Sequence, residues 1–216
     1  MVRLDGVRKP KKRCSARQVG LLLLGCLLLG AALGTFAKFL DYRQGILPAV
    51  LQRLDGALDL HNFLGGFAPW LFLALCIALY SAGPWYGAAN VFAFFAGMVS
   101  AYYLYSYFVA GFFPKDYAMI WVALTVASPF LAWLCWYAKG SGPLALLLSA
   151  GIVGVFLDMT FSWGRWYLDL RSWLNAGLLL LTLVVLRRGP KQMVVMVLAG
   201  MGIAVLLDGI LPFRLW

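Results

Sequence analysis

The sequence is poor in the side chains from which most enzyme and metal sites are built. It contains no glutamate, its eight acidic residues are all aspartates, and its one histidine is His61. General acid–base pairs and metal centres draw mostly on glutamate or on several histidines. Phosphate-binding and dinucleotide-binding glycine motifs are also absent from the sequence. We therefore expect a protein that is not an enzyme and that uses no metal and no cofactor.

Charged residues of any kind are scarce. They make up 12% of the chain, whereas 63% of the residues are hydrophobic and the mean hydropathy is +0.86. A soluble domain needs more polar surface than this to cover itself. The composition therefore predicts an integral membrane protein.

The net charge of +10 does not indicate a nucleic-acid partner, because it is concentrated at one end of the chain. Residues 3–17 hold seven of the 18 lysines and arginines and no acid except Asp5. A basic stretch beside an apolar segment is typical of a cytoplasmic tail that faces anionic lipid. We expect residues 1–18 to form such a tail. The apolar run that follows is longer than a signal-peptide core and has no cleavage site, so we expect it to be retained as a span.

The four cysteines do not follow a disulfide or zinc spacing. They are Cys14, Cys26, Cys76 and Cys135, and three of them lie inside apolar segments. We expect them to be small buried hydrophobic residues.

Seven apolar segments follow the basic tail, and they predict an all-α fold, a polytopic transmembrane helical bundle in residues 19–216. About 20 apolar residues cross a bilayer. The predicted spans are about 19–40, 64–82, 85–113, 117–138, 143–163, 172–186 and 192–211. The sixth is short, so six spans with one re-entrant segment is the alternative. Residues 163–171, rich in tryptophan and tyrosine, are predicted to be a loop or interfacial turn.

The segment between the first two spans has a different character. After Pro48, the apolar residues Val50, Leu51, Leu54 and Leu58 recur at three- and four-residue spacing. This period predicts an amphipathic helix over about 47–60 that lies in the membrane interface. The alternative is that this helix covers a binding site as a lid.

Residues 84–114 carry the most distinctive pattern, because they contain no charged side chain. At heptad spacing, the first half presents Ala89, Ala93 and Ala96, and the second half presents Tyr103 and Tyr107. Small residues allow another helix to approach closely, whereas tyrosines provide an aromatic wall with hydroxyl groups. Gly30 and Gly34 form a similar small pair on the first span.

The distribution of basic residues predicts the orientation. With the N-terminus in the cytoplasm, the inner segments hold eleven lysines and arginines and the outer segments hold seven. The excess favours a cytoplasmic N-terminus and an external C-terminus. In this orientation the tyrosines, Asp158 and Asp208 lie in the outer half of the bundle.

Asp158 and Asp208 are the acidic residues nearest to the membrane core. A carboxylate there is costly, so it usually faces a cavity or a partner such as Lys38, Arg165 or a tyrosine hydroxyl. The alternative is that both lie solvated among the headgroups. An intramembrane aspartyl protease would need both carboxylates in one site, and its GxGD and YD phrases are absent.

These observations predict two kinds of function. The first is the binding or transport of a small solute in an outward-facing aromatic and acidic cavity. Its candidate ligand-binding residues are Tyr103, Tyr107, Asp158, Asp208 and Lys38. The second is association with a partner membrane protein or another copy of the chain. It would use the small residues Gly30, Gly34, Ala89, Ala93 and Ala96. In both, the bilayer is the constant partner.

Two stretches of the chain resemble a family of uncharacterised bacterial multi-pass membrane proteins. The phrases are GAALGTFAKFLD at 30–41, and APWLFLALCIALYSAGPWYGAANVFAFFAGMVSAYY and WYAKGSG within 67–142. The resemblance implies a helical bundle in the bacterial inner membrane and no activity. The architecture is also similar to that of the substrate-binding subunits of energy-coupling-factor vitamin transporters. This likeness implies an outward-facing ligand site capped by the loop after the first span.

Overall fold

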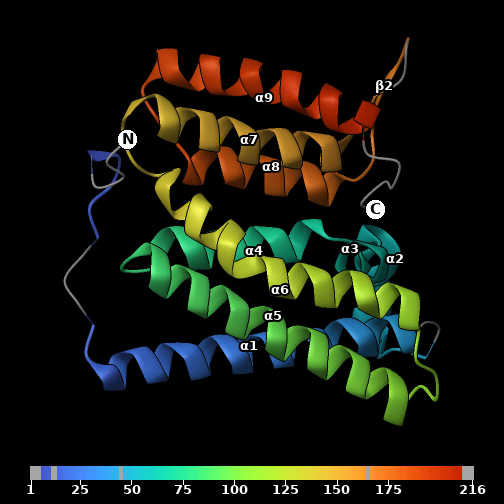
Figure 1. Cartoon of the computed structure of the whole chain (residues 1–216). Helices are drawn as coiled ribbons and strands as arrows, with labels where there is room; N and C mark the ends of the chain where they lie inside the picture. Colours follow the sequence, from blue (N-terminus) through green and yellow to red (C-terminus); the bar gives the residue numbers. More distant parts are fainter. Residues whose placement is uncertain (1–5, 11–13, 44–45, 164–165, 211–216) are drawn as a thin grey trace.

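The computed structural model describes residues 6–10, 14–43, 46–163 and 166–210. These residues form nine helices and one short hairpin of two antiparallel strands (Figure 1). The helices are α1 (Ala16–Tyr42), α2 (Ala49–Leu58), α3 (Leu60–Gly65), α4 (Ala68–Tyr80), α5 (Pro84–Phe108), α6 (Lys115–Tyr137), α7 (Gly142–Thr160), α8 (Trp173–Val185) and α9 (Pro190–Ile210). The strands are β1 (Phe161–Trp163) and β2 (Leu168–Leu170).

Five of these helices are long and apolar enough to cross a membrane: α1, α5, α6, α7 and α9. The all-α prediction is confirmed apart from the hairpin, which replaces the expected loop or turn. The count of seven spans is not confirmed. Helices α4 and α8 have 13 residues each, or about 20 Å of helix, against a hydrocarbon core of about 30 Å.

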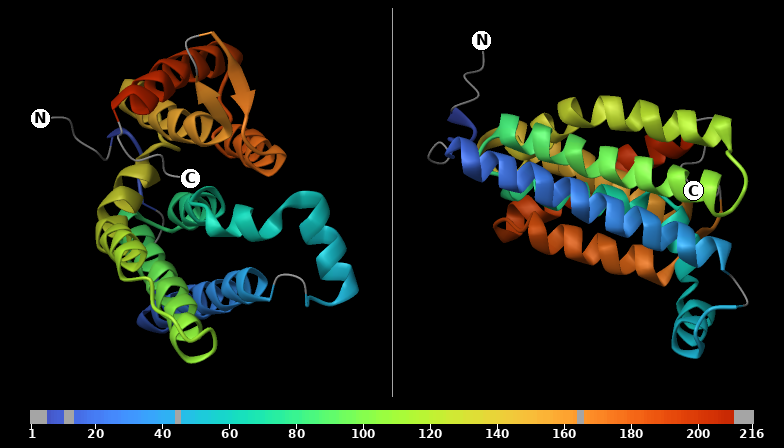
Figure 2. Two further views of the ribbon diagram at one scale, coloured as in Figure 1. Left: turned by 90° about the vertical axis from the view of Figure 1, so that its right-hand side faces the viewer. Right: turned by 90° about the horizontal axis from the view of Figure 1, so that it is seen from below.

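The seven helices from the predicted span regions lie side by side with alternating direction (Figures 1 and 2). Their buried side chains form two main clusters. One joins α1, α4, α5 and α6, and the other joins α7, α8 and α9 to the ends of α4 and α6. Helix α4 holds the two together, because Trp70 and Ala74 belong to the first cluster while Leu75 and Leu79 belong to the second.

Close contact between α1 and α5 depends on glycine. A β-carbon at Gly30 or Gly34 would collide with the backbone of α5 at Phe94 and Met98, and one at Gly97 would collide with the backbone of Leu27. Gly30 and Gly34 thus contact the same chain and are not exposed for a partner, which corrects that part of the association hypothesis. Of the alanines in that hypothesis, Ala93 is buried, Ala96 is half-buried and Ala89 is exposed.

Helix α6 continues through Pro129, which lies inside it. A proline in a helix leaves the carbonyl four residues earlier without its amide donor. Here that carbonyl belongs to Thr125, and the Ser128 hydroxyl donates to it at 2.8 Å. Pro129 therefore removes one backbone hydrogen bond of α6, and the preceding residue Ser128 replaces it with a bond from its side chain.

The end of the bundle where α1 begins is held together by arginines, and we name it the basic end. Arg8 donates to the carbonyl oxygens of Leu79, at 2.9 Å, and Trp136, and its guanidinium lies 4.1 Å from the centre of the Trp136 ring. Arg188 donates to the carbonyl oxygen of Ala138 and, at 3.1 Å, to the Ser149 hydroxyl. Carbonyls at helix C-termini lack intrahelical donors, so the two arginines cap α4 and α6.

The opposite end, with α2, α3 and the hairpin, is named the hairpin end (Figure 1). The amphipathic helix expected over 47–60 is interrupted there. Asp59 has a left-handed backbone with φ of 54°, ends α2 and directly precedes α3. The chain thus turns a corner between the two helices, as Figure 2 shows, before α4 begins.

Candidate functional site

A small cavity lies at the hairpin end between α3, α4, α5 and α6. We name it the tyrosine cavity. Its lining is mainly aromatic and consists of Leu64, Gly65, Trp70, Met98, Val99, Tyr102, Tyr103, Tyr117 and Trp121. Its volume is about 10 Å³, which is close to the space needed for one water molecule. Nothing larger fits unless a wall moves.

Tyr103 is a buried residue in the lining of this cavity. Its exposed fraction is 7%, and its hydroxyl makes no hydrogen bond within the part of the chain that the structure describes. Its ring lies against Tyr102 and Phe113, with centroid distances of 5.1 and 5.5 Å. A buried hydroxyl without a partner costs about 1–3 kcal/mol. The cavity beside Tyr103 is therefore a suitable place for a molecule that hydrogen-bonds.

Helix α3 closes the cavity through its backbone. The Trp70 indole donates to the Leu64 carbonyl at 2.9 Å, and the Tyr117 hydroxyl donates to the Gly65 carbonyl at 3.0 Å. Next to them, Phe67 stacks on Trp121 at 4.5 Å between centroids. Two hydrogen bonds thus hold α3 over the cavity, and the stacked pair beside them joins the start of α4 to α6.

Lys38 lies near the tyrosine cavity but does not line it. Its ammonium group pairs with the Asp41 carboxylate at 2.6 Å and lies 4.6 and 5.2 Å from the ring centres of Phe112 and Tyr102. The Lys38 side chain is buried, with an exposed fraction of 3%. The charge of Lys38 is balanced by Asp41, which lies in the same helix α1. The two aromatic rings beside its ammonium group come from the end of α5 and from the turn after it.

Tyr107 does not share a site with Tyr103. It is 61% exposed, and its ring contacts Phe108. A step of four residues turns an α-helix by only about 40° from one side chain to the next, so the two tyrosines leave α5 on nearly the same side. Tyr107 lies in the last turn of α5, where Phe108 and the C-cap residue Val109 are exposed as well.

The two aspartates of the predicted cavity lie in the other half of the bundle. Asp208 of α9 is 3.7 Å from the Arg171 guanidinium, and Asp158 of α7 is buried with an exposed fraction of 3%. Arg171 also donates to the Phe161 carbonyl at 2.9 Å, which ties the base of the hairpin to this polar group. Neither aspartate lines the tyrosine cavity. Arg165, their other expected partner, lies outside the described residues.

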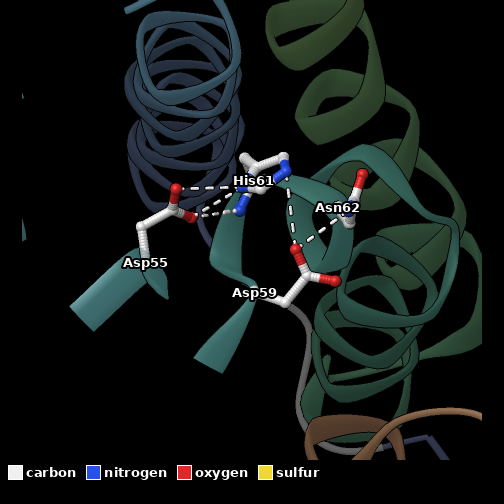
Figure 3. A network of polar contacts seen from close by, with 4 residues as sticks. All are labelled: Asp55, Asp59, His61 and Asn62. Carbon is white, nitrogen blue, oxygen red and sulfur yellow. Dashed lines mark hydrogen bonds and ion pairs between the residues drawn. The ribbon is translucent and has the colours of Figure 1, made fainter. Parts of the chain in front are cut away.

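Sequence reasoning missed a polar group at the corner between α2 and α3 (Figure 3). The His61 Nδ1 atom lies 2.9 Å from both Asp55 carboxylate oxygens, and the His61 backbone amide donates to Asp55 at 2.8 Å. On the other side, His61 Nε2 is 3.4 Å from Asp59, which also accepts from Asn62. The signal was present, since an aspartate precedes this histidine by two and by six residues.

The charge state of this corner is sensitive to acid. Burial raises the pKa of Asp55, but hydrogen bonds and the charge of His61 outweigh burial and hold that pKa below its ordinary value. The carboxylate is therefore stabilised in its ionised form, and it fixes the start of α3. Since α3 covers the tyrosine cavity, this corner positions the cover.

No protein-family model, curated protein or solved structure matches this chain. The resemblance to an uncharacterised bacterial membrane family therefore stays a prediction, as does the architectural likeness to vitamin-transporter subunits. Among the described residues, no three histidine, cysteine or acidic side chains are grouped to hold a metal ion. The chemistry that the site offers is aromatic contact and hydrogen bonding.

Proposed function

We propose that this protein binds a small solute in the tyrosine cavity, at the hairpin end of a membrane-embedded bundle. The five long apolar helices are those of an integral membrane protein. The observation that carries the proposal is the Tyr103 hydroxyl, which is buried beside a cavity and has no hydrogen-bond partner among the described residues. Packing alone does not require a phenol at this position, since phenylalanine would fill it without a buried polar atom.

The solute enters when α3 moves. The cavity has room for about one water, so binding a larger molecule requires the Trp70 and Tyr117 hydrogen bonds to α3 to open. In this proposal the α2–α3 segment acts as the lid, and the Asp55–His61 contact keeps it in register. The charge distribution favours a cytoplasmic N-terminus, and the family resemblance implies the bacterial inner membrane. With this orientation we expect the entrance to face the outside of the cell.

The predicted acidic part of the cavity changes in this proposal. Asp208 pairs with Arg171 beside the hairpin and Asp158 is buried in α7, and neither lines the solute site. The solute is therefore expected to be recognised by aromatic faces and one hydroxyl, without a carboxylate. Association through Ala89 and the other small residues is the alternative, and the burial of Gly30 and Gly34 against α5 weakens it.

Native mass spectrometry of protein purified in mild detergent from its host membrane tests the proposal. We expect a retained small molecule on the wild type that is lost from Tyr103→Phe, which removes one oxygen, and from Val99→Ile, which adds one methylene to the lining. Tyr107→Phe is the matched control, because Tyr107 is exposed. A wild-type chain without any small molecule would contradict the proposal. A molecule that Tyr103→Phe and Val99→Ile both retain as well as the wild type does would also contradict it.

A further inference from the structure

Helix α2 exposes a continuous apolar stripe. The exposed fractions are 69% for Ile46, 71% for Val50, 44% for Leu54 and 43% for Leu58, and these residues recur every four positions. No residue of α2 is buried in the bundle. Residues four apart stack along one face of a helix, so Val50, Leu54 and Leu58 form a stripe along α2, and Ile46 lies in the bend just before the helix. Nothing in the described chain covers this stripe.

The position of α2 identifies what covers it. It follows α1, a candidate membrane span of 27 residues that ends at Tyr42, and it leads through α3 into α4. The same end of the bundle presents exposed aromatic side chains: Trp166, Trp173 and Tyr167 around the hairpin, and Tyr107 and Phe108 at the end of α5. Tryptophan and tyrosine concentrate at the boundary between membrane and water. The hairpin end thus lies at that boundary, and so does α2.

We propose that α2 lies in the plane of the membrane interface and that its stripe inserts into the leaflet at the hairpin end. Figure 2 shows α2 at the margin of the bundle, crossing the direction of the long helices. The polar residues Gln52 and Arg53 lie on the rest of the helix surface and remain in contact with headgroups and water. This proposal does not depend on solute binding in the tyrosine cavity.

The charge of the segment specifies the kind of lipid surface. Arg53 is accompanied by Asp55 and Asp59, so α2 and its C-cap have no excess of positive charge. Helices that bind membranes through electrostatic attraction to anionic lipid carry lysines and arginines on the polar face. Insertion of α2 is therefore driven by apolar burial, and a zwitterionic phosphatidylcholine surface is sufficient for it.

Fluorescence quenching tests this placement. In a background without the four native cysteines, Val50→Cys and Gln52→Cys each carry a bimane label on the full chain in phosphatidylcholine nanodiscs. Brominated acyl chains should quench the label at position 50 at least threefold more than the label at position 52. Aqueous iodide should show the reverse order. Adding 30% anionic lipid should leave both ratios unchanged. Circular dichroism and size-exclusion elution equal to those of the unlabelled protein serve as the folding control.

Each other result would overturn the proposal. Equal quenching of both labels by iodide would place α2 in water. A label at position 50 that neither quencher reaches would show that protein covers the stripe, and disulfide cross-linking of Val50→Cys between chains would then identify a second copy as the cover. A requirement for anionic lipid would contradict insertion by apolar burial. As a second variant, Leu54→Asp should increase iodide quenching at position 50, because it places a charge in the centre of the stripe.

Discussion

Gly30 of α1 lies directly against the Phe94 carbonyl of α5, with no room between them for a β-carbon. The same geometry recurs in the opposite direction, where Gly97 of α5 lies against the Leu27 carbonyl of α1. Between helices in a membrane there is no hydrophobic driving force, so their association depends largely on van der Waals packing. Small residues such as glycine let the two backbones approach closely enough for this packing. This contact gives the first prediction.

Replacing Gly30 with alanine should destabilise the bundle by about 1–3 kcal/mol, the usual cost of overpacking. Gly25→Ala is the matched control on the same helix, because nothing lies within 4 Å of a β-carbon at that position. It should be neutral or stabilising by up to about 1 kcal/mol, since alanine favours helix. Thermal unfolding in mild detergent measures both, and a Gly30→Ala variant as stable as Gly25→Ala would contradict the α1–α5 contact.

Replacing Arg8 with alanine should loosen the basic end. Arg8 donates to the Leu79 and Trp136 carbonyls, and hydrogen bonds from charged groups contribute about 1.5–3 kcal/mol each. Lys9→Ala is the control, because Lys9 is exposed. Limited proteolysis should cut before α1 faster in Arg8→Ala than in the wild type or in Lys9→Ala. Equal rates in all three proteins would show that the arginine does not hold this segment.

The corner between α2 and α3 should weaken in acid. The folded-state pKa of Asp55 lies below its ordinary value, which is about 4. Its contribution to stability is therefore complete above that ordinary value and is lost as the pH falls through the folded-state pKa. Amide hydrogen exchange in Leu60–Gly65, corrected for intrinsic rates, should increase below about pH 4.

Asp55→Asn should make that exchange fast at neutral pH and nearly constant across the same range. Asp169→Asn, on the exposed hairpin strand β2, is the control and should behave like the wild type. Acid-induced exchange that persists in Asp55→Asn would assign the effect to another group.

The contact between Arg171 and Asp208 should appear as a coupling energy. Their charged atoms are 3.7 Å apart and both side chains are largely buried, and residues in contact usually couple by about 0.5–3 kcal/mol. A double-mutant cycle with Arg171→Gln and Asp208→Asn, followed by unfolding, measures it. Arg171→Gln alone should cost more than Asp208→Asn alone, because it also removes the donor to the Phe161 carbonyl. A coupling energy of zero would mean that the two groups do not interact.

The sequence predicted which segments are helical more accurately than it predicted where each helix begins and ends. The run from Phe63 through Phe67 is apolar, so hydropathy joins it to the following span, yet Gly66 ends α3 and α4 begins only at Ala68. Hydropathy measures transfer to lipid and does not distinguish a helix that crosses from one that begins inside the bundle. The stripe of α2 was predicted correctly, because its four-residue period is a property of the local chain.

The residues of the candidate site were harder to group. Tyr103 was predicted as a cavity residue and lies beside one, but Tyr107, Asp158 and Asp208 were joined to it only by their position near the same end. Depth in the membrane is readable from a sequence, whereas lateral position is set by helix packing. The glycines show the same limit: spacing identified Gly30 and Gly34 as a packing surface, and only the fold shows that α5 occupies it.

The Arg8 contacts also bear on how the chain is assembled. Its two carbonyl acceptors lie 71 and 128 residues further along the chain. At a synthesis rate of about 5–20 residues per second, the second acceptor emerges roughly 6–26 seconds after Arg8. During that interval α1 and α5 can already pair, while Arg8 has only the first of its two carbonyl acceptors, that of Leu79. Closure of the basic end is thus a late event in biogenesis. Arg8 can make both of its contacts only after the first six helices have been synthesised, because the Trp136 carbonyl lies near the end of α6.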